Sequence, residues 1–143
     1  MQLDLPEQRS DRTETEELLL RAVHWFADAE LQRNPENRVQ SYVTCFDMFF
    51  STREGGVTAA VQDGVAFFMG HDRDSRVRIH RFVGEAYDSR SRASHEGSAL
   101  DLPGTIVALE QLVVNSIAEM LRRRDELPDK KAIKDCVFQQ RMS

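Results

Sequence analysis

The sequence is poor in cysteine. Its 143 residues contain two, Cys45 and Cys136, which are far apart and lack Cys-x-x-Cys spacing. This pattern excludes a disulfide framework and a zinc motif built on paired cysteines. The acidic first seven residues also lack the apolar core of a signal peptide. We therefore expect a cytoplasmic protein.

Long apolar runs and alternating patterns are missing too. No apolar run approaches the ~20 residues that a membrane helix needs, so we expect no membrane association. No stretch alternates polar and apolar residues for long enough to predict a strand, and there is no internal repeat. Hydrophobic residues make up 41% of the chain and charged residues 30%, which indicates a folded globular domain rather than a disordered chain.

The charge is unevenly distributed. The net charge of −5 argues against a protein that coats nucleic acid. Residues 71–95, however, carry six arginines against four acids, and three of the four histidines. Taken alone, Arg73, Arg76 and Arg78 are best interpreted as a solvated helix face. The strip as a whole fits a small anionic target better than a long duplex.

Apolar spacing and capping signals predict helices throughout the chain. The predicted helices span residues 13–33, 36–52, 57–69, 75–91 and 103–127. Thr13 or Asp11 can cap the first helix, and Asn34-Pro35 restarts the chain as a cap and first helical residue. The third helix is expected to be weakened by Gly64.

The second predicted helix has the clearest core face. Its apolar residues follow helical spacing: Val39, Tyr42, Val43, Phe46, Phe49 and Phe50. We expect an all-α protein, an antiparallel up-and-down bundle of four to five helices. Residues 1–12 would form a flexible acidic lead, 13–127 the helical domain and 128–143 a flexible tail.

The most informative stretch runs from Tyr87 to Gly97. In the helix that precedes it, Ile79, Val83, Ala86 and Arg90 share one face, so the buried stripe ends in an arginine. We expect His95 in a polar loop five residues later. A guanidinium beside an imidazole can grip a phosphate and move a proton.

This stretch resembles the signature of HEPN domains (higher eukaryotes and prokaryotes nucleotide-binding). The run Tyr-Asp-x-Arg-Ser-x4-His-x-Gly contains the Arg-x4-6-His hallmark as Arg90 and His95, and it is closest to the ApeA-like branch. The resemblance extends from about residue 21 to 121. It implies a HEPN-like helical bundle and a metal-independent endoribonuclease without a cofactor, of the kind that acts in antiviral defence or as a toxin-type effector.

The resemblance also assigns the chemistry. Arg90 and His95 would be catalytic, cleaving single-stranded RNA to 2′,3′-cyclic phosphate and 5′-OH ends. The imidazole would move the protons, and the guanidinium would stabilise the charge on the phosphate. Gly97 stands where the toxin branch carries a tyrosine that a partner enzyme modifies, and Glu96 stands where the ApeA-like branch usually has glycine.

Five further residues would support the motif. Asp47, on the apolar face of the second helix, would orient Arg90 or Arg92, or else it faces solvent at the edge of the stripe. Asp88 would hold the guanidinium or balance local charge. Ser91 and Ser94 would bind phosphate or satisfy the helix end, and Arg92 would be a second phosphate contact or a solvated neighbour.

The remaining histidines and the aromatics are interpreted as structural. His24, His71 and His80 show no ligand spacing, and Tyr87 suits the core or an interface. The expected partners are an RNA substrate, a second copy of the chain that completes the active site, and an antitoxin or sensor domain. The alternative function is a catalytically silent HEPN module for dimerisation or for binding nucleotide or RNA; an unrelated helical adaptor is a third.

Overall fold

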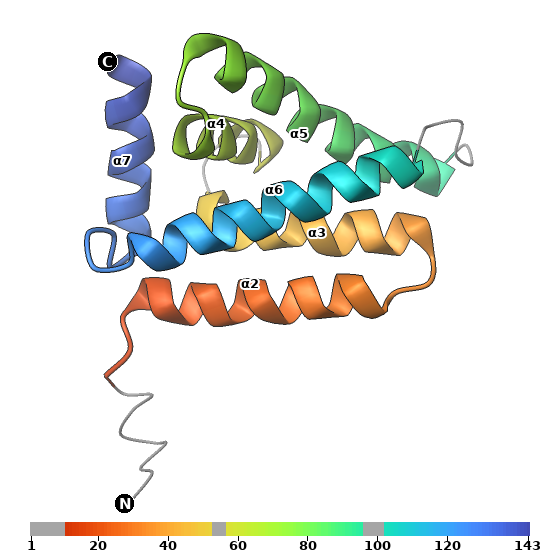
Figure 1. Ribbon diagram of the computed structural model, residues 1–143, viewed down its shortest axis with the longest axis horizontal. Coiled ribbons are helices and arrows are strands. Elements are labelled where there is room, and N and C mark those ends of the chain that lie inside the picture. The colour runs from red at the N-terminus through yellow and green to blue at the C-terminus, as the bar shows by residue number, and fades with distance from the viewer. Residues whose placement is uncertain (1–10, 53–56, 96–101) are drawn as a thin grey trace, which may run out of the picture.

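The computed structural model describes residues 11–52, 57–95 and 102–143, and it describes only the backbone of Val57, residues 89–95 and Leu102. The described residues form helices and no strand, which confirms the all-α class (Figure 1). The helices are α2 (Glu14–Leu31), α3 (Pro35–Phe50), α4 (Val57–Met69), α5 (Arg73–His95), α6 (Leu102–Arg122) and α7 (Lys130–Met142).

The helix α3 lies at the centre of the bundle. It packs against α2 on one side, and α6 and α5 also contact it. α2 and α3 run in opposite directions, and α6 runs antiparallel to α2 (Figure 1). α4 packs on α5, and α7 stands beside α4 at a steep angle to α6.

Local capping explains where the helices begin. Thr13 accepts a hydrogen bond from the Glu16 backbone N–H, and the Glu16 carboxylate accepts one from the Thr13 N–H in return. Asn34 caps α3 by accepting from the Asn37 N–H at 3.0 Å, with Pro35 as the first helical residue. Asp72 caps α5 through the Ser75 N–H at 2.8 Å. The starts of α2 and α3 agree with the capping signals in the sequence, whereas α5 begins two residues before the predicted start at residue 75.

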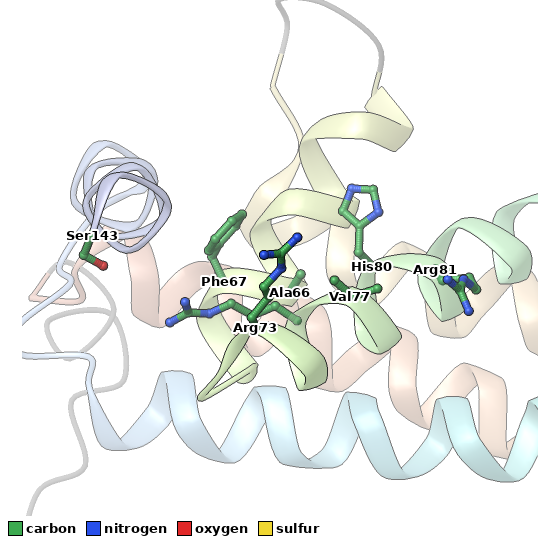
Figure 2. Close-up of a pocket in the computed structure, with 8 residues that line it drawn as sticks. Ala66, Phe67, Arg73, Val77, His80, Arg81 and Ser143 are labelled. Atoms are coloured by element: carbon green, nitrogen blue, oxygen red, sulfur yellow. The ribbon is translucent and has the colours of Figure 1, made fainter.

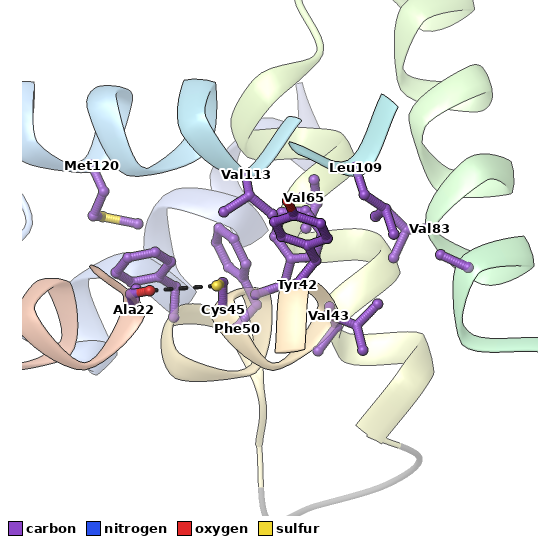
Figure 3. Close-up of a cluster of buried hydrophobic side chains, with 14 of the residues drawn as sticks. Ala22, Tyr42, Val43, Cys45, Phe50, Val65, Val83, Leu109, Val113 and Met120 are labelled. Atoms are coloured by element: carbon purple, nitrogen blue, oxygen red, sulfur yellow. Dashed lines mark hydrogen bonds between the residues drawn. The ribbon is translucent and has the colours of Figure 1, made fainter. Parts of the chain in front are cut away.

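The predicted apolar face of α3 is confirmed as the core (Figure 3). All six of its residues are buried: Val39, Tyr42, Val43, Phe46, Phe49 and Phe50. Gly64 in α4 packs against this face, and a Cβ there would lie 2.5 Å from Phe50 Cδ1. Gly64 is expected to weaken α4. The structure shows that its missing side chain also allows α4 to pack closely against Phe50 of α3.

The structure corrects two predicted helix ends. α5 continues to His95, so the prediction of a polar loop from residue 94 is wrong at its start. α6 ends at Arg122 rather than near 127, because the chain turns over residues 123–126 and buries Leu127. The Arg124 guanidinium donates to the Leu121 carbonyl at 2.8 Å and so satisfies one acceptor at this helix end.

The prediction of a flexible tail over residues 128–143 is also wrong. These residues contain α7, which Asp129 caps by accepting from the Ala132 N–H at 2.8 Å. Ile133 is only 1% exposed, so α7 is docked by apolar burial. The Thr15 N–H donates to Pro128 O at 3.0 Å and thereby ties the segment before α7 to α2.

The helix α6 is both long and apolar. By length and hydropathy its segment Pro103–Arg122 could cross a membrane, contrary to the expectation that no apolar run approaches that length. Its residues Leu109, Val113 and Met120 are fully buried in the bundle. Only 28% of the apolar segment is buried, and Val107, Val114 and Leu121 are exposed, so burial in the bundle accounts for part of the hydropathy of α6.

Candidate functional site

The C-terminal half of α5 carries the HEPN-like motif, directly after a buried stretch of the same helix. Val83 and Ala86 are fully buried and Tyr87 is 5% exposed, which confirms the predicted stripe up to that point. Position 90 continues the same face, four residues after Ala86. The side chains of Arg90, Ser91, Arg92, Ser94 and His95 lie outside the described residues, so their roles stay predictions.

The helical backbone sets the relation between the two motif positions. Because α5 is continuous through His95, positions 90 and 95 are separated by about 140° around the helix axis and about 7.5 Å along it. Side chains three or four residues apart meet on a helix, whereas those five apart do not. The two motif positions therefore belong to different faces of α5.

Asp47 is the one predicted supporting residue that the structure joins to α5. It lies on α3, is partly buried, and accepts a hydrogen bond from the Tyr87 hydroxyl. Tyr87 is thus part of the core, as expected, and Asp47 does not merely face solvent at the stripe edge. The orientation of Arg90 or Arg92 by Asp47 stays a prediction. Asp88 is exposed.

A polar cluster that the sequence did not indicate links α2, α3 and α6. The Tyr42 hydroxyl donates to Glu30 Oε2 at 2.9 Å, and it lies 3.5 Å from Glu110 Oε2. Arg38 donates to Glu30 at 3.1 Å and to the Tyr42 hydroxyl at 3.0 Å. Arg38 and Tyr42 are one helical turn apart, but Glu110 is 68 residues from Tyr42, so sequence spacing does not reveal the whole cluster.

Electrostatics within this cluster favour the protonated form of Glu110. The hydrogen bond and the charge of Glu30 raise the pKa of Glu110 above its ordinary value. Burial raises the pKa of Tyr42 to about 12, so its hydroxyl stays protonated and donates at neutral pH. The hydrogen bonds of this cluster therefore hold α2, α3 and α6 together.

His80 lines a cavity of about 490 Å³ between α4, α5 and the end of α7 (Figure 2). Its Nε2 lies 3.2 Å from Asp63 Oδ1, and its Nδ1 lies 3.4 Å from the Gln62 side-chain nitrogen. Since an amide nitrogen can only donate, Nδ1 accepts and Nε2 carries the proton of the neutral ring. Both ring nitrogens thus hold α5 to α4, which agrees with a structural role for His80.

The Cys45 thiol, another candidate reactive group, also has a structural role. Burial raises the pKa of the Cys45 thiol to about 12, and its Sγ lies 3.4 Å from Ala22 O (Figure 3). The thiol is therefore a packing group and not a nucleophile at neutral pH. Over the described ranges, His, Cys, Asp and Glu side chains form no group of three or more that could hold a metal ion.

Comparison of the chain with known proteins identified no relative. No family model matches it, and neither the curated proteins nor the solved structures include a significant match. The function is accordingly argued from the residues and the fold.

Proposed function

We propose that this chain is a metal-independent endoribonuclease with a HEPN-like bundle, and that it cleaves single-stranded RNA through Arg90 and His95. The observation that carries the proposal is the position of the motif. It occupies the last turns of α5, directly after the buried Val83, Ala86 and Tyr87, and the Tyr87 hydroxyl is bonded to Asp47 of α3. The helix that carries the motif is therefore fixed to the core one turn before Arg90, which supports a preorganised site.

The proposed reaction is an internal transfer within the RNA. The 2′-oxygen attacks the adjacent phosphorus, the bond from phosphorus to the 5′-oxygen breaks, and a 2′,3′-cyclic phosphate and a 5′-OH form. Imidazole removes the 2′ proton, and an imidazolium supplies a proton to the leaving oxygen. Arg90 binds two phosphoryl oxygens and stabilises the charge that develops on them.

A two-fold homodimer would complete this site. Positions 90 and 95 lie on different faces of one helix, so a second chain is the natural source of the missing partner group. Tyr87, one of the residues that the sequence suggested for the dimer contact, is buried within its own chain and is not available. Phe82 is partly buried beside Leu112 of α6 and still fits such a contact.

The product ends test the reaction. Purified protein is incubated with single-stranded RNA with and without EDTA, and we expect 2′,3′-cyclic phosphate and 5′-OH ends in both cases. His95→Ala should abolish cleavage and leave the melting temperature nearly unchanged. Wild-type rates in the His95→Ala variant would exclude the assignment.

Mixing variants tests the composite site. Arg90→Ala and His95→Ala chains are inactive alone, and the mixture should regain part of the activity if each site takes groups from two chains. Light scattering should give the mass of a dimer at micromolar concentration. A monomeric mass together with no recovery on mixing would exclude the composite site.

A further inference from the structure

We infer that the cavity between α4, α5 and the end of α7 binds a small organic phosphate with an apolar body. The cavity is about 490 Å³ and is shown in Figure 2. This volume falls in the range of small-molecule sites. The site is separate from the proposed nuclease motif, because Arg81 precedes Arg90 by nine residues, about 14 Å along α5.

Three arginines give the cavity its charge. Arg73, Arg76 and Arg81 all line it, on a protein whose net charge is −5. Among the described residues, Arg73 and Arg81 form no hydrogen bond or ion pair, and both are exposed. Arg73 and Arg81 are eight residues apart on α5, about 12 Å along its axis, and lie at opposite ends of the cavity (Figure 2). Because neither guanidinium has a partner in the described part of the chain, the two side chains can turn towards a phosphate held between them and donate charge-assisted hydrogen bonds to it.

The third arginine, Arg76, already has hydrogen-bond partners within the protein. Arg76 donates to Gly70 O at 3.3 Å and to Gln140 Oε1 of α7 at 3.2 Å, and it lies 5.3 Å from the centre of the Phe67 ring. These contacts fix one wall and leave the anion to the other two arginines. His80 adds no free proton-transfer group, since Asp63 and Gln62 occupy its ring nitrogens. The cavity is therefore built for binding rather than catalysis.

The apolar residues that line the cavity indicate that the ligand carries an apolar group beside its phosphate. Ala66, Phe67 and Val77 line it together with the arginines, and Val77 is 46% exposed. An apolar side chain left exposed beside cations suits a ligand with a hydrophobic or aromatic group next to its phosphate. A strand of RNA fits less well, because the exposed acids Glu85 and Asp88 follow Arg81 along α5 and would repel further phosphates.

Calorimetric titration with phenyl phosphate tests the inference, with inorganic phosphate and phenol as the two half-ligands. We expect phenyl phosphate to bind about 10-fold more tightly than inorganic phosphate, because the ring adds apolar burial, and phenol to give no measurable binding. Arg73→Gln and Arg81→Gln should each weaken phenyl phosphate binding by about 10-fold or more, the loss of one charge-assisted contact.

Arg78→Gln is the matched control. Arg78 is an exposed arginine of the same helix but lies on the α6 side, beside Phe82 and Gln111. It should leave binding unchanged, and circular dichroism should give the same helix content for all three variants. The inference is overturned if phenyl phosphate does not bind at millimolar concentration, or if Arg78→Gln weakens binding as much as Arg81→Gln. It is also overturned if an RNA oligonucleotide displaces phenyl phosphate from the wild-type protein.

Discussion

The Tyr87 hydroxyl donates a hydrogen bond to Asp47 Oδ1 and so joins α5 to α3 one turn before Arg90. The ring of Tyr87 is 5% exposed, which places this polar contact at the edge of the core. A directional bond at that point fixes both the rotation of α5 about its axis and its height on α3. The position of residue 90 is set by the same bond.

The first prediction concerns this bond. Tyr87→Phe keeps the ring and removes the donor, and we expect a loss of about 1–3 kcal/mol in the free energy of unfolding because the acceptor is a carboxylate. RNA cleavage should fall further than the loss of folded protein explains. Tyr42→Phe is the control, since it also removes a hydroxyl from a buried ring but leaves Asp47 untouched. Equal loss of cleavage in both variants would contradict a positioning role for Tyr87.

The second prediction concerns the guanidinium at position 90. Lysine keeps the charge but cannot donate two parallel hydrogen bonds, so Arg90→Lys should lower cleavage by about 100-fold or more. Arg92→Lys, two residues further along the helix, should retain most of the activity if Arg92 is a solvated neighbour. Cleavage rates under single-turnover conditions measure both. Full activity in Arg90→Lys would show that only charge is needed there.

The third prediction concerns the close contact between α3 and α4. Gly64→Ala improves helix propensity by about 1 kcal/mol but places a Cβ 2.5 Å from the Phe50 ring. We expect overpacking to outweigh that gain and lower stability by about 1–2 kcal/mol net, measured by urea unfolding. Gly84→Ala is the comparison, because its Cβ meets the amide end of Gln62 rather than a buried ring, and its expected cost is the loss of the hydrogen bond from Gln62 to the His80 carbonyl. A more stable Gly64→Ala variant would be evidence against this packing.

The fourth prediction concerns the docking of α7. Ile133 is 1% exposed, so Ile133→Ala should create a cavity and cost about 2–5 kcal/mol. Phe138 lies on the same helix and is 57% exposed, and Phe138→Ala should change stability by about 0.5 kcal/mol or less. Chemical denaturation compares the two. Similar small effects would indicate that α7 does not pack on the bundle in solution.

The fifth prediction concerns pH and the carboxyl pair of α2 and α6. The pKa of Glu110 is raised above its ordinary value of 4.5, so this carboxyl binds its proton more tightly when the chain is folded. Its contribution to stability is therefore present at low pH and is lost as the pH rises through the raised pKa. Relative to Glu110→Gln, the wild-type melting temperature should rise as the pH falls from 7 towards 4.5.

Glu85→Gln controls for the general loss of negative charge on acidification. Glu85 is an exposed acid of α5 and lies outside this cluster. Its substitution should leave the pH dependence of the melting temperature parallel to that of the wild type. A parallel curve for Glu110→Gln as well would show that Glu30 and Glu110 do not interact in solution.

The sequence by itself determined the helices α2 to α6 and several of their starts, but not α7. The caps at Thr13 and Asn34 and the apolar face of α3 depend on contacts within one or two turns, so residue order is enough to predict them. It also identified Asp47, Arg90 and His95 as candidates, because residue types at fixed spacing can be recognised without a structure.

Only the tertiary structure decided which distant side chains meet. Tyr87 and Asp47 are 40 residues apart, and Tyr42 and Glu110 are 68 apart. Their pairing depends on how the helices pack, and local sequence does not specify packing. The same holds for α7, whose weak apolar pattern becomes a docked helix because the bundle offers Ile133 a buried position. Burial likewise raised the pKa of Cys45, and the meeting of α4, α5 and α7 formed the cavity that three arginines of α5 line.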